Sequence, residues 1–321
     1  MVEIIDNQEI WNRSIFECNN TNPYQLFEWG EYKKRFNWKV LRLKINYNGR
    51  ICFVQMTYKV KFNSFIGWII GNIIGDLNAF NKEVVFRFIQ DQLNIYKIYI
   101  RSNFSDKLTS QNSFDLYCNK WKKTSKQIDS EYTFFQNLTK PEEMLSLFSK
   151  NFRKNVKRGI ERNKLITLKK LQDVDTHLID KVFRDFSNVK DNISLPSLEE
   201  IDEIKHKLGQ HIYLGYSIID NEIVALRAFL YYKDTAIDFW AAANHKARET
   251  YSSYVLLYNL LLKSSSLGLK NYDLSGIDPV NNQGVYNFKK GLRAELIQKT
   301  GEWEMTNSKV LSFIINKVYL K

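Results

Sequence analysis

The sequence predicts an α+β protein made of two consecutive units, each with a mixed sheet. Short runs of β-branched and aromatic residues alternate with segments of helical period along the chain. A similar succession of strands and helices occurs before and after residue 148, although no residue-level repeat is visible. With 321 residues, of which 44% are hydrophobic, the chain is long and apolar enough to build two cores.

The first unit begins with a predicted helix and a hairpin. Residues 24–38 carry aromatic side chains at helical spacing, so we expect a helix there. Asn48-Gly49 joins two β-branched and aromatic runs, and this dipeptide is a strong signal for a tight hairpin turn. The same patterns predict strands at 38–47, 51–60, 65–74, 95–102 and 133–138, and a helix at 82–93.

A cationic helix is predicted at the start of the second unit. Residues 151–170 hold eight basic residues and one acidic residue, a surplus of seven within the net charge of +12. Apolar residues recur every fourth position on one side of this segment, at Phe148, Phe152, Val156 and Ile160. The change in character predicts a domain boundary near residue 148.

The rest of the second unit repeats the strand and helix patterns. A long helix is expected at 249–267, where Gly268 would form its C-cap. Strands are expected at 212–220, 222–232, 236–242, 271–274 and 294–304. A last helix at 307–319 alternates apolar and basic residues, and we expect it to fold back on the first unit.

Charge and cysteine content narrow the class of protein. The net charge of +12 and the pI near 9.3 favour polyanionic partners, with a solvated basic surface as the alternative. Cys18, Cys52 and Cys118 form no paired motif, so reduced thiols in the cytoplasm are expected. The N-terminus lacks the features of a signal peptide, and the longest apolar run, residues 65–75, is too short to span a bilayer.

No metal site or cofactor is expected. His206 and His211 are five residues apart, which does not place them on one helix face, and HExxH and paired Cys/His spacings are absent. The glycine-rich phosphate-binding motifs of P-loop and Rossmann proteins are also absent.

Two segments carry residues suited to chemistry. The cations of the helix at 150–164 could follow a phosphate backbone, although a solvated helix face is the simpler interpretation. Residues 272–291 form a strand end, a Ser-Gly turn flanked by Asp273 and Asp278, and a short helix with Phe288 and Lys289. We expect Lys289 beside a developing negative charge or a substrate phosphate, with Phe288 as an aromatic wall; alternatively, both aspartates cap turns.

The order of these segments resembles the FemABX family over nearly the whole chain. The resemblance is carried by residues 272–278 and 284–291, in which Phe288-Lys289 matches the family's Phe-Lys pair. Residues 29–34 with Trp38 are similar to the family's N-terminal helix, 151–158 to its basic helix, and 224–268 to its strand–helix run. The family often has Asp-Leu-Gly-Gly where this chain has Ser275 in place of one glycine.

The resemblance implies two tandem GNAT-like domains, without the coiled-coil arm of larger members. The first, residues 1–147 completed by 306–321, would bind the acceptor, and the second, 148–305, would bind the donor and catalyse. The implied reaction moves an amino acid from aminoacyl-tRNA to an amine of a nucleotide- or lipid-linked peptidoglycan precursor. A lipid-linked acceptor would bring the protein into peripheral contact with a membrane.

The resemblance also implies roles for individual residues. Lys289 and Phe288 would form the catalytic centre, with Asp278 as a candidate for the general base. The acceptor would meet Lys33, or its neighbour Lys34, together with Trp29 and Trp38. The tRNA would contact Arg153, Lys154, Lys157 and Arg158.

Two other functions remain open at this point. One is an N-acyltransferase of the same fold that uses acyl-CoA or an acyl carrier protein on an amino sugar of a surface polysaccharide. The stretch at 244–250, which would hold the CoA pyrophosphate, contains no glycine and disfavours it. The other is a nucleic-acid-binding protein without enzymatic activity, which leaves residues 272–291 unexplained.

Overall fold

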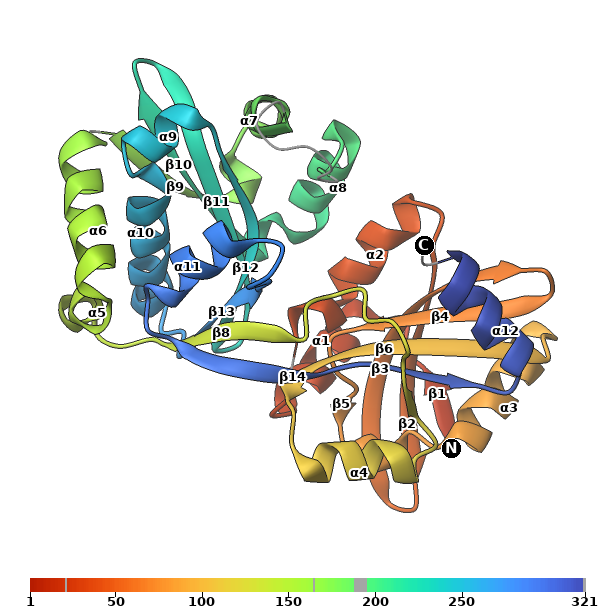
Figure 1. Ribbon diagram of the computed structural model, residues 1–321. Coiled ribbons are helices and arrows are strands. Elements are labelled where there is room, and N and C mark those ends of the chain that lie inside the picture. Colours follow the sequence, from red (N-terminus) through yellow and green to blue (C-terminus); the bar gives the residue numbers. More distant parts are fainter. Residues whose placement is uncertain (21, 164, 188–194, 320–321) are drawn as a thin grey trace. The chain divides into compact units, whose positions relative to one another are not determined.

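The computed structural model describes residues 1–20, 22–163, 165–187 and 195–319 (Figure 1). The chain forms two compact units. One consists of Met1–Glu131 together with Ile297–Lys321, and the other is Tyr132–Leu296. The first unit is therefore discontinuous in sequence, and the second is a continuous insertion into it.

A mixed sheet forms the centre of the first unit. Its strands lie in the order β1-β2-β3-β4-β6-β14, and all pairs are antiparallel except the parallel pair of β4 and β6. The bounds are β1 (Val2–Ile4), β2 (Lys39–Tyr47), β3 (Arg50–Lys61), β4 (Ser64–Ile70), β6 (Lys97–Lys107) and β14 (Glu295–Thr306), with short strands β5 (Ile74–Gly75) and β7 (Lys122–Lys123). The predicted Asn48-Gly49 turn joins β2 to β3 with positive φ at both residues, as a two-residue hairpin requires.

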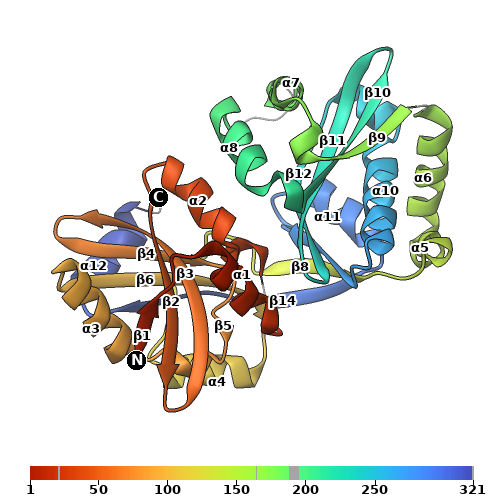
Figure 2. The ribbon, with the colours of Figure 1, turned by 180° about the vertical axis from the view of Figure 1, so that it is seen from behind.

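Helices cover both faces of this sheet. On one face, α1 (Gln8–Glu17) and α2 (Phe27–Arg35) lie over β2 and β3 (Figure 2), while α12 (Lys309–Ile314) packs on β6. On the other face, α3 (Lys82–Leu93) and α4 (Ser110–Cys118) close the larger core around Val54, Ile98 and Ile100. Single turns at Pro23–Gln25 and Leu77–Ala79 and a π-helical turn at Ile315–Tyr319 complete the unit.

The C-terminal segment is fastened to the first unit by a buried arginine. Arg101 on β6 is fully buried and donates hydrogen bonds to Glu302 on β14 and to Asn316 beyond α12. The second Glu302 oxygen accepts from the backbone N–H groups of Ile128 and Asp129, at 3.2 and 3.0 Å. One ion pair thus joins β6, β14, a connecting loop and the C-terminal helix.

The second unit has its own mixed sheet, in the order β8-β13-β12-β11-β10-β9, in which only β12 and β13 are parallel. Its bounds are β8 (Tyr132–Asn137), β9 (Leu165–Lys170), β10 (Ile212–Ile219), β11 (Glu222–Tyr232), β12 (Thr235–Ala243) and β13 (Asn271–Gly276).

Helices again lie on both faces of the second sheet (Figure 1). One face carries α5 (Pro141–Leu147), α6 (Lys150–Arg162), α10 (Ser252–Ser266) and α11 (Gln283–Lys290), and the other carries α7 (Thr176–Ser187) and α8 (Leu198–Leu208). Short helical segments are α9 (His245–Glu249), Leu171–Asp173 and Gly209–His211.

Several predicted boundaries differ from the structure. The units divide after Glu131 rather than near residue 148, because β8 pairs with β13 and α5 packs in the core of the second unit. The helix predicted at 249–267 is α10, which begins at Ser252 because Tyr251, with a φ of 56°, separates it from α9. The second crossing between the units lies within β14, after Leu296, and not at residue 305.

The apolar stripe predicted on α6 is wrong at its last position. Phe152 and Val156 are buried, but Ile160 is 52% exposed and Gly159 is buried instead. Positions four apart drift by about 40° per step on a helix of 3.6 residues per turn, so the buried face moves back by one residue. Gly159 faces α10 closely: a Cβ there would lie 2.9 Å from the carbonyl oxygen of Tyr251.

In the described part of the chain, no helix combines the length and the apolar character that a membrane crossing requires. The three cysteines form no disulfide; Cys52 is buried and Cys118 is exposed.

Replacing Glu302 with alanine should destabilise the first unit by about 3 to 5 kcal/mol, because it leaves the buried Arg101 guanidinium without its counter-charge. The measurement is urea unfolding followed by tryptophan fluorescence. Glu17→Ala, which removes an exposed carboxylate at the end of α1, is the matched control and should change stability by about 0.5 kcal/mol or less. Equal losses in the two variants would contradict this account of the ion pair.

Candidate active site

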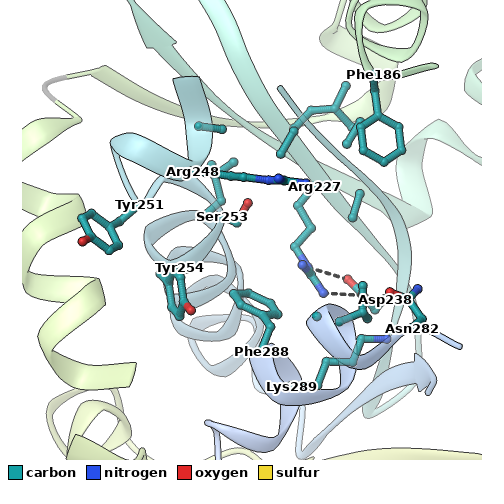
Figure 3. A pocket seen from close by; sticks show the side chains of 18 residues that line it. Phe186, Arg227, Asp238, Arg248, Tyr251, Ser253, Tyr254, Asn282, Phe288 and Lys289 are labelled. Carbon is teal, nitrogen blue, oxygen red and sulfur yellow. Dashed lines mark hydrogen bonds and ion pairs between the residues drawn. The ribbon is translucent and has the colours of Figure 1, made fainter. Parts of the chain in front are cut away.

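A cavity of about 730 Å³ opens in the second unit between β11, β12, α9, α10 and α11, with Phe186 of α7 at its edge (Figure 3). Much of its wall is apolar, formed by residues such as Leu226, Ala242, Leu256 and Val285. Its charged lining residues are Arg227, Asp238, Arg248 and Lys289. An apolar hollow with a few convergent charged groups is the usual form of a ligand site.

Arg227 and Asp238 form a buried bidentate ion pair on the cavity wall. Arg227 Nε donates to Asp238 Oδ1 at 2.8 Å and Nη2 donates to Oδ2 at 2.5 Å, and both side chains are 8% exposed. Burial alone would lower the pKa of Arg227, but Asp238 outweighs it and raises that pKa. The Tyr272 hydroxyl donates to Asp238 Oδ1 at 3.4 Å, and burial followed by the Asp238 charge raises the pKa of Tyr272 well above its ordinary value.

A β-bulge places Asp238 on the cavity side of the sheet. Ala241 on β12 pairs with Arg227 on β11, so by simple alternation residue 238 would face the opposite side. The register shifts by one between Ala228 and Phe229, and Asp238 then pairs with Phe229. This extra residue turns the carboxylate toward Arg227, a common use of a bulge next to a functional site.

A cluster of three aromatic rings contacts the ion pair through Phe288. The Phe288 ring lies 5.4 Å from the Arg227 guanidinium, in the range of a cation–π contact. Tyr254 packs edge-on against both Phe288 and Phe152, with 4.9 Å between centroids in each case. Phe288 therefore forms one wall of the cavity, between Arg227 and the rings of Tyr254 and Phe152.

Lys289 lines the same cavity and is only 6% exposed. Its Nζ donates to the carbonyl oxygens of Gly276 and Ser275, at 2.9 and 3.4 Å. These carbonyls belong to a second irregular turn, in which Ser275 has a φ of 60° and its Oγ donates to the Asp238 carbonyl at 2.5 Å. Glycine adopts this positive φ without steric cost, so it suits the position. In this chain the position is a serine, and its hydroxyl bonds the turn to β12.

Asp278 does not line the cavity. Asp278 is partly exposed, and its carboxylate accepts hydrogen bonds from the backbone N–H groups of Val280 and Asn281 and from the Asn281 amide, at 2.8 to 2.9 Å. The Asn281 backbone N–H, the Asn281 amide and the Val280 N–H hold the pKa of Asp278 below its ordinary value. The structure thus shows the turn-capping arrangement that the sequence left as the alternative. Asp273, the other aspartate, is buried and accepts from Thr133 and from Ser275 N–H.

The predicted RNA-contacting cations lie along α6. Lys154 and Lys157 are exposed, whereas Arg153 donates to the Ser146 carbonyl at 2.9 Å. Arg158 donates to the Tyr251 hydroxyl at 3.1 Å, and Tyr251 lines the cavity. One end of the cationic helix is therefore adjacent to the cavity.

The predicted acceptor residues lie together on the first unit. The Lys33 ammonium is 5.1 Å from the Trp29 ring and 4.7 Å from the Tyr32 ring, whereas Lys34 pairs with Glu31 at 2.8 Å. Trp38 faces Lys59, at 4.5 Å. The helix α2 that carries most of them is held by the buried Arg42, which donates to Glu31, to Gln55 and to the Phe27 carbonyl.

Sequence reasoning missed Arg227, Asp238, Arg248 and Tyr254. A usable signal was present: Arg227 interrupts an otherwise apolar strand, and Asp238 interrupts the next one. Buried charges are retained in such strands mostly when they pair. Within the described ranges, no three His, Cys, Asp or Glu side chains converge as a metal site would require.

Comparison with known proteins supports the fold and a family. Residues 199–319 match the model of the FemAB family. A solved structure described as FemX is similar over 99% of this chain and 100% of that one, with a TM-score of 0.80 and 14% identity. No curated protein sequence matches.

Two further solved structures have a similar fold. The C-terminal domain of a putative lysylphosphatidylglycerol synthetase from Agrobacterium fabrum matches 93% of this chain and 91% of that one, with a TM-score of 0.60 and 12% identity. A tandem GNAT protein from the clavulanic acid biosynthesis pathway matches 84% of each chain, with a TM-score of 0.53 and 6% identity. The predicted tandem GNAT-like fold is confirmed.

Replacing Asp238 with asparagine should destabilise the second unit by about 3 to 5 kcal/mol, because Arg227 would remain buried without its counter-charge. The double variant Arg227→Met/Asp238→Leu should lose less than the single one, because it removes both charges. Urea unfolding of the three proteins measures this order. A double variant that is less stable than Asp238→Asn would contradict it.

Proposed function

We propose that this chain is an acyltransferase of the FemAB kind, which moves an amino acid from aminoacyl-tRNA to an amine of a peptidoglycan precursor; the match of residues 199–319 to the FemAB family model and the fold similarity to FemX support this. In this proposal, the second unit binds the donor and catalyses transfer, the first unit binds the acceptor, and the reaction takes place in the cytoplasm.

The observation that carries the proposal is a buried lysine beside an aromatic wall in a net positive cavity. Arg227 and Asp238 neutralise each other, so Lys289 and Arg248 leave the cavity with an excess of positive charge. Figure 3 shows Arg248 reaching over the cavity from α9 and Lys289 entering it from α11. Such a site favours a ligand that is negatively charged or becomes so during reaction.

The chemistry requires little more than positioning and charge stabilisation. The acceptor amine attacks the carbonyl carbon of the aminoacyl ester, and a tetrahedral oxyanion forms. The bond to the ribose oxygen then breaks, the amide remains on the acceptor, and the amine proton ends on the ribose hydroxyl. In this proposal, Lys289 stabilises the oxyanion or the adjacent phosphate, and Phe288 packs against the terminal nucleoside.

The first unit offers a site suited to a sugar-nucleotide or sugar-lipid diphosphate. Lys33 holds its ammonium against the faces of Trp29 and Tyr32. Trp38, which directly precedes β2, has the ammonium of Lys59 on β3 over its ring, at 4.5 Å. Aromatic faces and a cation suit a sugar or base next to a phosphate. Lys34 is the weaker choice because Glu31 already neutralises it.

Replacing Lys289 with methionine should lower kcat by about 100- to 1,000-fold, because the variant keeps the volume but removes the stabilising charge. The assay follows radiolabelled amino acid from a pool of aminoacyl-tRNAs into nucleotide-linked cell-wall precursors. Thermal unfolding of the variant serves as the control for folding, since Lys289 also supports the turn at Ser275.

Parallel reactions with labelled acyl-CoA test the other donor class. Transfer from CoA alone would contradict the tRNA donor and leave α6 as a solvated basic face. RNA binding without transfer from either donor would favour a binding protein instead of an enzyme.

Replacing Lys33 with alanine should raise the KM for the acceptor by about tenfold, corresponding to the loss of one charge-assisted contact. The KM for the aminoacyl donor should stay unchanged, because the donor site lies in the second unit. Lys34→Ala is the matched control and should have a smaller effect. A larger effect in Lys34→Ala would exchange the roles of the two lysines.

A further inference from the structure

We propose that a second, smaller cavity in the second unit binds the nucleotide that precedes the terminal, aminoacylated nucleoside of the donor RNA. This inference rests on the proposed function and adds a second nucleotide subsite to it. The cavity measures about 360 Å³ and lies between α6, α10 and α11.

The two cavities share a wall. Tyr254 lines both of them, and consecutive residues of α11 divide between them: Phe288 and Lys289 line the first, and Asn287 and Lys290 line the second. Phe152 lines the second cavity and packs 5.5 Å from the Phe288 ring. A strand of RNA whose last nucleoside occupies the first cavity can therefore continue into the second across an aromatic edge on which bases can stack.

The second cavity has the chemistry of a nucleotide site. Three amides and two cations line it, at Asn151, Asn155, Asn287, Lys290 and Arg293, and none of the described lining residues is acidic. Among the described residues, these five side chains have no hydrogen-bond or ion-pair partner; only the Lys290 ammonium has a further contact, 5.5 Å from the Tyr286 ring. The cations suit a phosphodiester, and the amides suit ribose hydroxyls or base edges.

One face of α6 connects this cavity with the first. Asn151, Asn155 and Arg158 are spaced four and three residues apart and therefore share a helix face. Asn151 and Asn155 line the smaller cavity. Arg158 donates to the hydroxyl of Tyr251, which lines the larger cavity, at 3.1 Å. A continuous polynucleotide can use both ends of this face, whereas a small isolated anion would occupy only one.

The test compares RNA binding by the wild-type protein and by Lys290→Gln/Arg293→Gln, a variant that removes both charges from exposed positions. The probe is an unacylated RNA hairpin with the single-stranded 3′ tail of a tRNA, and fluorescence anisotropy at several salt concentrations measures its affinity. We expect about tenfold weaker binding and a smaller salt dependence, by about 0.7 in the slope for each lost phosphate contact. A hairpin that lacks the last two nucleotides should bind both proteins equally.

A charge-matched control separates the cavity from general attraction. Lys169→Gln/Lys181→Gln removes two exposed lysines from β9 and α7 of the same unit, and should change binding by less than about twofold. Equal losses in the two double variants, or no loss in Lys290→Gln/Arg293→Gln, would overturn the proposal.

A minimal donor distinguishes this subsite from the proposed function. With the aminoacylated terminal nucleoside alone, Lys290→Gln/Arg293→Gln should transfer as fast as the wild type, because the subsite has nothing to bind. Slower transfer by this variant would mean that Lys290 and Arg293 act in the reaction itself, and would overturn the inference. If the wild type binds RNA but transfers from no donor, the proposed function fails while the binding comparison still decides the subsite. The subsite proposal would also be overturned if CoA displaced the RNA hairpin while Lys290→Gln/Arg293→Gln bound that hairpin as tightly as the wild type.

Discussion

The candidate active site depends on a pair of opposite charges that is almost completely removed from water. Arg227 and Asp238 are both nearly buried, and either one alone would be costly in that position. The pair joins a side chain of β11 to one of β12, and the Phe288 ring packs on its guanidinium. The backbone carbonyl of Asp238 also accepts a hydrogen bond from Ser275, which connects the Ser275 turn to the same position. Lys289 in turn donates to the carbonyls of that turn, so the same network of contacts holds its ammonium in the cavity.

The first unit uses buried arginines in the same way. Arg42 holds α2 through Glu31, Gln55 and the Phe27 carbonyl, and Arg101 holds β14 and the C-terminal helix through Glu302 and Asn316. A guanidinium has five donors in a fixed plane, so one residue can join several segments with defined geometry. In both units, therefore, arginine positions the helices and turns that carry the candidate ligand-binding side chains.

The sequence could predict what local chemistry determines. The Asn48-Gly49 hairpin and the tandem fold are present, and Phe288 and Lys289 both line the same cavity. Asp238 could not be placed, because a one-residue bulge reverses the face that alternation assigns to it. The boundary near residue 148 was wrong because β8 looks like any other strand in sequence, and only its pairing with β13 assigns it to the second unit.

The division of the first unit into two sequence segments has a consequence for synthesis. Residues 1–131 leave the ribosome without β14, so β6 keeps an open edge and Arg101 lacks Glu302 until the last part of the chain is made. Residues 132–296 are contiguous and can form their own sheet during that interval. The second unit can thus fold before the first unit is complete. Until β14 is synthesised, the exposed edge of β6 must be kept from pairing with strands of other chains.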